Sequence, residues 1–314
     1  METNKQDERA VPDTPGDDAD TEPKIAPMLV LASLSLGQLS NVILLATGVL
    51  IEQGSVTTVF LQTAFTTILL WFLVRPKRKA GWSLWWRGLL LGSSNAASLV
   101  AFREAQSIAP YATVTCTWLV LGPMMAAGYR IVRSQMWRAL GWLALTLPGT
   151  VLVVDGLKPA SITALLWVGV TAVTYHIHVK INSGLPKEDI DTCSTLGKMT
   201  NMVVVTVLLL SVEGSGALLG IDWKALAVCS GAAVLFVGST LLMNAAWKTG
   251  LHVTSHAMLM PAKPALSLLL GMIAGQFLSL ANWLGIALVT VAGWGSKRTQ
   301  IRDQTKKGRR PGLG

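Results

Sequence analysis

Apolar residues occur in ten runs of about 20 residues, and this pattern predicts ten membrane-spanning helices. A helix of about 20 residues is about 30 Å long, which is enough to cross the hydrocarbon of a bilayer. The runs lie near residues 27–47, 56–74, 85–104, 110–131, 138–155, 160–181, 193–213, 223–245, 252–275 and 278–295. No large soluble domain fits between them. The predicted fold class is an all-α polytopic membrane protein.

Composition and charge refine this prediction. Only 14% of the residues are charged, and the mean hydropathy is +0.50. Residues 1–24 hold eight of the 17 acidic residues and lack the basic start and apolar core of a signal peptide, so we expect a disordered acidic cytoplasmic tail. Residues 298–314 form a basic tail.

The basic residues alternate between the predicted loops. Of the 26 Lys and Arg residues, 21 fall on the side of the two termini, and only Lys158 and Lys224 fall on the other side. The positive-inside rule then predicts that both termini are cytoplasmic and that the chain is a multi-pass protein of the plasma (inner) membrane. The basic tail is interpreted as an orientation signal, and no nucleic-acid partner is predicted.

The sequence contains no motif for metal binding, ATP use or serine hydrolysis. Cys116, Cys193 and Cys229 lie in different spans without metal-ligand spacing, so no metal, disulfide or cofactor is predicted. No GxxxxGK[ST] sequence supports ATP use. An intramembrane serine hydrolase built on Ser93 or Ser94 is an alternative without a GxSxG context, and we do not expect an enzyme.

Lys263 is the most unusual residue of the predicted spans. It lies between Pro261 and Pro264 in the middle of residues 252–275, where no other side chain is fully charged. A lysine at the centre of a membrane helix costs about 2.5 to 3.5 kcal/mol, so it usually faces a partner, a polar cavity or a substrate. The prolines free backbone carbonyls that only a cavity or a neighbouring helix can satisfy. Lys263 is therefore the first candidate site residue.

The chain shows signs of an internal duplication. A shift of 141 residues brings Pro123 onto Pro264, Trp142 onto Trp283 and Ala105 onto Ala246. Ten spans divide into two repeats of five, over residues 25–156 and 157–297. Because five is odd, the second repeat enters the membrane from the opposite side, and such inverted repeats place a substrate site at the midplane between them.

Three segments carry a resemblance to a known family. They are LQTAFTTILLWFLVRPKRK, AQSIAPYATVTCTWLVLGPM and LMPAKPALSLLLGMIAGQFLSLANWLGIALVTVAGW. The chain resembles the drug/metabolite transporter (DMT) superfamily over roughly residues 27 to 298, in its EamA-like branch, and especially the threonine/homoserine exporter group. The resemblance implies a bacterial inner-membrane carrier whose cavity is lined by helices one, three, four, six, eight and nine and which exports amino acids or related metabolites.

The sequence departs from that group at its acidic positions. Lys263 and Gln276 stand where the group has acids, and the acidic position of helix four falls at or beside Trp118 and Leu119. A cavity without these carboxylates and with an added ammonium should favour an anion. We therefore predict an anionic or zwitterionic small-molecule substrate, and a homodimer is left open.

Polar positions within the spans complete the set of candidates. His256, Lys263 and Ser267 share one face of span nine. The predicted substrate-binding residues are Lys263, His256, Asn41, Asn95, Gln38, Trp118, Tyr175, Ser267 and Asn244, and the candidates for proton coupling are His256, His176 and Glu104.

Each of these residues also has an ordinary structural interpretation. Asn and Ser in membrane helices often only bond to neighbouring helices, and Tyr175 could be an interfacial aromatic. Arg103, Glu104 and Lys198 are expected to reach the interface with water.

The predicted function is a secondary transporter that exports a small amino acid or other carboxylate-bearing compound by alternating access. A non-transporting membrane partner is the main alternative.

Overall fold

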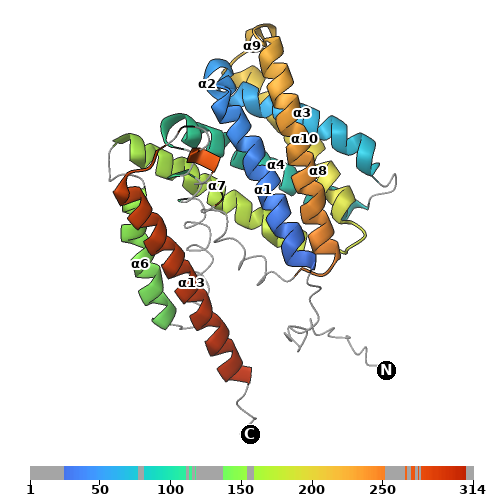
Figure 1. Ribbon diagram of the computed structural model, residues 1–314. Helices are drawn as coiled ribbons and strands as arrows, with labels where there is room; N and C mark the ends of the chain where they lie inside the picture. Colours follow the sequence, from blue (N-terminus) through green and yellow to red (C-terminus); the bar gives the residue numbers. More distant parts are fainter. Residues whose placement is uncertain are drawn as a thin grey trace, which may run out of the picture.

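The computed structural model is all helical in the part of the chain that it describes, which comprises residues 25–76, 81–110, 113–114, 117, 137–153, 159–251, 266, 270–272, 275 and 277–308 (Figure 1). The helices of this part are α1 (Ile25–Ala46), α2 (Val49–Gln53), α3 (Ser55–Val74), α4 (Trp82–Ile108), α6 (Trp137–Val153), α7 (Pro159–Ser183), α8 (Ile190–Val212), α9 (Gly216–Leu219), α10 (Trp223–Lys248) and α13 (Leu280–Gly308).

Eight of the ten predicted spans coincide with one of these helices. The other two, 110–131 and 252–275, lie mostly outside the described residues. Helix α13 continues to Gly308, well into the predicted basic tail. Within the described residues, α1, α3, α8 and α10 are long and apolar enough to cross a membrane. The structure thus indicates a multi-pass membrane protein.

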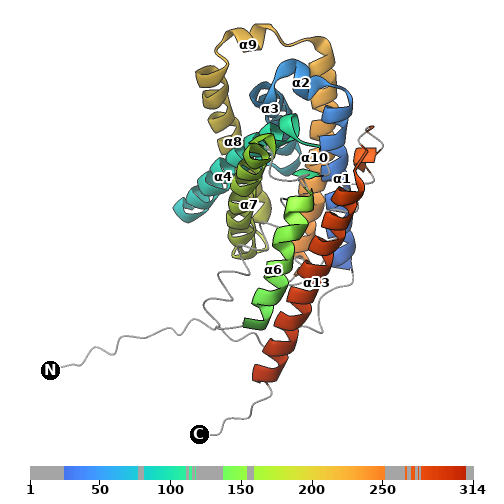
Figure 2. The ribbon, with the colours of Figure 1, turned by 90° about the vertical axis from the view of Figure 1, so that its left-hand side faces the viewer.

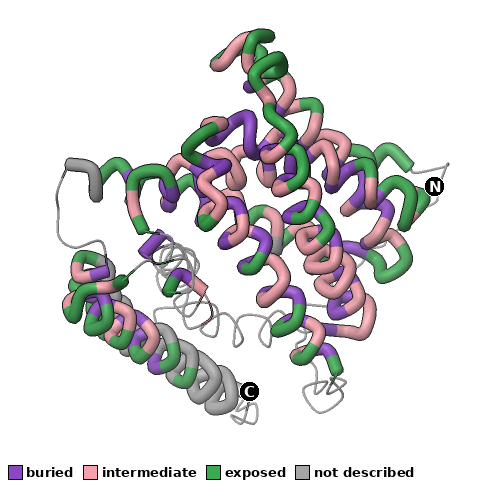
Figure 3. The backbone as a smooth tube through the Cα atoms, turned by 45° about the horizontal axis from the view of Figure 1, so that its top comes forward, coloured by how far each residue is buried: buried purple, intermediate pink, exposed green. Residues whose placement is uncertain are grey.

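Large apolar side chains cover the outside of the helices. Phe72, Leu166 and Val207 are exposed, and Figure 3 shows exposed and half-buried positions along the outer faces of the helices. Exposed apolar area on this scale marks a surface that contacts another apolar phase. Lipid provides that phase for a bundle of this kind.

Interhelical hydrogen bonds join α1 to α10. The Ser33 hydroxyl donates to the Ser239 carbonyl oxygen at 2.7 Å, and the Ser239 hydroxyl donates back to the Ser33 carbonyl oxygen at 2.8 Å. Ser40 donates to the carbonyl oxygen of Ala232 at 2.7 Å. Small hydroxyl residues are typical of packing between membrane helices, because they let two backbones approach closely and still bond across the contact.

Helices α4 and α8 cross with their backbones in contact. A Cβ atom added at Gly92 would lie 2.3 Å from the carbonyl oxygen of Gly197, and one added at Gly88 would lie 2.9 Å from Cβ of Leu196. Gly88 and Gly92 are four residues apart and so lie on one face of α4, which is the small-xxx-small arrangement. This crossing fixes where the next turns of both helices place their polar side chains.

The two ends of the bundle differ. The short helices α2 and α9 lie together at one end, whereas the start of α1 and the end of α13 lie toward the other (Figures 1 and 2). At the first end, Lys224 forms an ion pair with Glu52 at 2.9 Å. At the second end, Lys248 of α10 pairs with Asp191 of α8.

Candidate functional site

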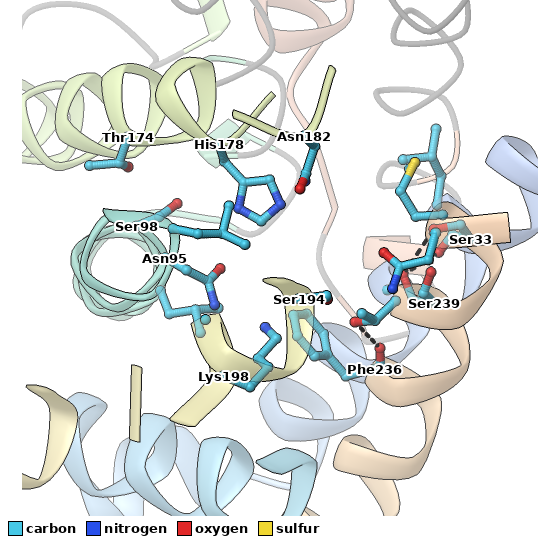
Figure 4. Close-up of a pocket in the computed structure, with 18 of the residues that line it drawn as sticks. Ser33, Asn95, Ser98, Thr174, His178, Asn182, Ser194, Lys198, Phe236 and Ser239 are labelled. Atoms are coloured by element: carbon cyan, nitrogen blue, oxygen red, sulfur yellow. Dashed lines mark hydrogen bonds between the residues drawn. The ribbon is translucent and has the colours of Figure 1, made fainter. Parts of the chain in front are cut away.

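A cavity of about 210 Å³, with both polar and apolar side chains on its wall, lies between α1, α4, α7, α8 and α10 (Figure 4). Of the predicted substrate-binding residues, the structure brings together Gln38 and Asn41 of α1, Asn95 of α4 and Asn244 of α10 on its wall. These four were selected from three spans far apart in the sequence, and the fold gathers them around one space.

The other predicted site residues are placed less directly. Lys263, His256, Ser267 and Trp118 lie outside the described residues. Tyr175 and His176 belong to α7, but their side chains are not described. Glu104 is half-buried on α4 and is not among the described residues that line the cavity. The roles predicted for all of them stay predictions.

Residues missed as candidates also line the cavity. His178 and Asn182 of α7 and Ser194 and Lys198 of α8 contribute to its wall. Figure 4 shows Lys198, Asn95 and Ser194 directed toward a common space, with His178 and Asn182 facing them from α7. Span seven was not expected at the cavity, and Lys198 was interpreted as an interfacial residue because it lies near the cytoplasmic end of that span.

The cavity wall repeats the sequence register of the two halves. Seven lining residues of α1 and α4 have a second lining residue 141 positions further along the chain, on α7 or α10. The pairs are Ser33 and Thr174, Gly37 and His178, Asn41 and Asn182, Asn95 and Phe236, Ser98 and Ser239, Leu99 and Thr240, and Phe102 and Met243. Positions 141 residues apart thus line the same cavity.

Lys198 is a buried cation whose described surroundings offer its ammonium an aromatic ring. Its side chain is only 6% exposed, and its ammonium nitrogen lies 4.4 Å from the centroid of the Phe236 ring. Within the described part of the chain, the ammonium has no ion pair and no hydrogen bond. The ring face attracts the charge but replaces only part of the water that the ammonium loses on burial.

Arg103 is buried in a different way. Its guanidinium is fully buried and donates to the amide oxygens of Gln106 at 2.7 Å, Asn41 at 2.8 Å and Gln62 at 3.1 Å. The Gln62 amide in turn donates to the Ser40 hydroxyl. This network joins α1, α3 and α4, and through Asn41 it reaches the cavity wall.

The expectation that Arg103 and Lys198 reach the interface is wrong. Both side chains are turned into the bundle, because the face on which a residue lies decides its burial once helices pack on that face. One signal for Lys198 was present in the sequence: Ser194, Gly197, Lys198 and Asn201 have the spacing of a single helical face of small and polar residues.

An ion pair lies next to Asn244, one of the residues on the cavity wall. The Asn244 amide donates to Asp191 at 3.0 Å, and the same carboxylate pairs with Lys248. Asp191 is therefore engaged by two groups of α10. Among the described residues, no three His, Cys, Asp or Glu side chains lie close enough together to hold a metal ion.

Comparisons with known proteins bear on the fold alone. No family model matches the chain, and no curated protein matches it. Among solved structures, 21 chains match. One, described only as the crystal structure of a protein, is 17% identical, covers 90% of this chain and 99% of its own, and has a TM-score of 0.55. At this identity the likeness shows that the arrangement of helices occurs in a crystal structure.

Proposed function

We propose that the protein is a secondary transporter that exports a small amino acid or other carboxylate-bearing metabolite across the bacterial inner membrane by alternating access. The observation that carries this proposal is a cavity inside an apolar helical bundle, with several polar side chains on its wall and with seven pairs of lining residues that lie 141 positions apart in the sequence. Inverted-repeat carriers bind their substrates at such an interface between repeats.

The pairing of helices supports two related halves. In two related halves, α1 would correspond to α7, α3 to α8, α4 to α10 and α6 to α13. Each contact between helices should then recur between the corresponding helices, so that the contact of α1 with α10 is matched by that of α7 with α4. The contact of α4 with α8 becomes that of α10 with α3, and the pairs α3 with α8 and α6 with α13 return to themselves. All of these contacts occur. We infer ten membrane helices in two inverted repeats, as the resemblance to the EamA-like carriers implies.

The same arrangement is compatible with the proposed orientation. The end with α2 and α9 carries the predicted outer loops, and the end with the Asp191 and Lys248 pair carries the predicted cytoplasmic ones. Each half would rock about the cavity, so that the two ends open in turn. Movement of a whole half needs contacts between the halves that can separate, and the exposed ion pair between Glu52 of the first half and Lys224 of the second half is one such contact.

The size and polarity of the cavity favour a small solute. Sites for drug-sized ligands usually have volumes of about 300 to 1,000 Å³, whereas this cavity holds about 210 Å³. Its wall combines asparagine, serine and threonine side chains with one lysine. An amino acid or a short organic acid is of the right size. No observation favours a hydrolase.

Counterflow into proteoliposomes tests the proposal. Purified protein is reconstituted, loaded with unlabelled amino and organic acids, and supplied with each labelled compound in turn. We expect at least one acid to enter faster than into protein-free liposomes. Ser98→Phe, which fills the cavity wall, should abolish that uptake.

Val203→Phe is the matched control, because it adds the same ring at a position that is 63% exposed on the outside of α8. Uptake should persist in this variant. If no member of the panel enters faster than into protein-free liposomes, a non-transporting membrane partner becomes the better description. If Ser98→Phe transports as well as Val203→Phe does, the route does not pass through this cavity.

A further inference from the structure

We propose that Lys198, with Asn95 and Ser194 beside it, binds a carboxylate of the substrate, and that the cavity selects solutes of net negative charge over zwitterions. This inference rests on the proposed function, since it names the chemical group that the same cavity holds. It is carried by the surroundings of Lys198, by the distribution of acidic residues and by the groups that face the lysine.

The first step is that the Lys198 ammonium lacks a counter-charge. The side chain is 6% exposed, and the Phe236 ring at 4.4 Å is the one interaction that the described residues give its charged group. A desolvated cation–π contact contributes about 2 kcal/mol, whereas removing an ion from water costs several kcal/mol. A bound anion would supply the missing interaction.

The second step is that the described wall of the cavity offers no acid to a ligand's amino group. None of its described lining residues is Asp or Glu. Residues 111–136 and 252–276, which include the two spans outside the description, contain no Asp or Glu either. Asp191 pairs with Lys248 and accepts from Asn244. Along the described wall, an amino group would therefore find amide and hydroxyl oxygens but no carboxylate.

The third step concerns the groups around the ammonium. Asn95 of α4 and Ser194 of α8 flank Lys198 and point into the same space (Figure 4). An amide nitrogen, a hydroxyl and an ammonium can all donate to one carboxylate, and hydrogen bonds to a charged group contribute about 1.5 to 3 kcal/mol each. The close crossing at Gly92 and Gly197 holds Asn95 and Lys198 near each other.

The Arg103 network adds positive charge on another side of the cavity. Asn41 lines the wall, and its amide oxygen accepts from Arg103 at 2.8 Å. The amide nitrogen of Asn41 is then the group that can donate to a ligand. Groups that are positively charged or can donate a hydrogen bond thus lie on more than one side of the cavity. A short dicarboxylate has an acceptor at each end and so fits this arrangement better than an amino acid, whose amino group is a cation.

Three probes of nearly equal size separate charge from shape. They are succinate, its monoamide succinamate and its diamide succinamide, which carry two, one and no negative charges. Binding to the purified full-length protein in detergent is measured by competition with labelled succinate. We expect affinity to fall in the order succinate, succinamate, succinamide, with threonine below succinamate.

Variants of Lys198 complete the experiment. Lys198→Met should weaken succinate binding at least tenfold and remove most of the difference between the three probes, whereas Lys198→Arg should keep their order. Lys224→Met is the control, since Lys224 is exposed and pairs with Glu52; binding should not change. Wild-type affinity for succinate in Lys198→Met, or no binding of succinate and succinamate to the unaltered protein, would overturn the inference.

The binding and transport results can fail separately. If succinate binds through Lys198 but no solute crosses the membrane in counterflow, the proposed function is wrong and the carboxylate site stands. If a neutral or zwitterionic solute is transported and no dicarboxylate binds, the proposed function stands and the carboxylate site is wrong.

Discussion

Arg103 and Lys198 are both cations buried inside the helical bundle, yet their surroundings differ. The Arg103 guanidinium donates to three amide oxygens on three helices. The Lys198 ammonium faces the cavity, and within the described chain it contacts an aromatic ring instead of an acceptor. Burying a charge costs free energy unless hydrogen bonds replace those to water, so the protein compensates much of the cost for Arg103 and little of it for Lys198.

This difference assigns the two residues to different tasks. Arg103 ties α1, α3 and α4 together and so belongs to the scaffold of the first half. Lys198 is held in place by the crossing of α4 and α8 and is directed at the space where a substrate would lie. Removing Arg103 should therefore damage the fold, whereas removing Lys198 should damage binding.

The largest expected effect on stability is that of Arg103→Met. Loss of the guanidinium leaves the amide oxygens of the buried Gln62 and Gln106, and of the half-buried Asn41, without this donor. Each unsatisfied buried group costs about 1 to 3 kcal/mol, so the free energy of unfolding should fall by about 3 kcal/mol or more. Denaturation in mixed detergent micelles measures it.

Arg87→Met on the same helix is the control for Arg103→Met. Arg87 is exposed and donates a single hydrogen bond, to the carbonyl oxygen of Gly184. Its replacement should change the free energy of unfolding by less than about 1 kcal/mol. Equal losses in the two variants would contradict a scaffolding role for Arg103.

A somewhat smaller loss is expected for Gly92→Ala, which tests how Lys198 is positioned. The added methyl group would lie 2.3 Å from the carbonyl oxygen of Gly197, so α4 and α8 must move apart. Overpacking of this kind costs about 2 kcal/mol. Thermal unfolding followed by circular dichroism should show the loss, and Gly231→Ala, where the new methyl group meets nothing within 4 Å, should show none.

Lys198→Met should leave the protein as stable as before or raise its free energy of unfolding by about 1 kcal/mol. The insertion cost of a lysine at the centre of a membrane helix, about 2.5 to 3.5 kcal/mol, is an upper bound for Lys198, which lies nearer the start of α8, and a cation–π contact offsets about 2 kcal/mol of it. The same denaturation assay measures the change. A loss as large as that of Arg103→Met would show that Lys198 is also part of the scaffold.

The smallest effect is expected at the contact of α1 with α10. Ser33→Ala removes the hydroxyl that donates to the Ser239 carbonyl oxygen, while Ser239 still donates back. Interhelical hydrogen bonds in membranes contribute about 0.6 kcal/mol on average. A double-mutant cycle with Ser239→Ala measures the coupling, and a coupling above about 2 kcal/mol would make this contact more important than that average implies.

The sequence predicted the helices well because hydropathy depends only on the order of residues. In the part of the chain that the structure describes, helices coincide with eight of the ten expected spans. The 141-residue shift inferred from Ala105 and Ala246 also relates Asn41 to Asn182 and Ser98 to Ser239 on the cavity wall. The sequence did not predict how each helix is rotated about its own axis. That rotation decides whether Lys198 reaches water or the cavity.

The sequence predicted part of the candidate site. Gln38, Asn41, Asn95 and Asn244 were selected because polar residues inside apolar spans need partners, and all four line the cavity. Lys198 was set aside because its distance from the helix end allowed it to reach the interface. The glycine contact between α4 and α8, which buries it, depends on which two helices meet and cannot be read from either helix alone.

The most direct test of the account is counterflow of labelled succinate into proteoliposomes that contain Lys198→Met at the same density as unaltered protein. We expect the unaltered protein to give uptake above that of protein-free liposomes, and the variant to give uptake at least tenfold lower although its unfolding temperature is no lower. Equal uptake by the two proteins would contradict the account.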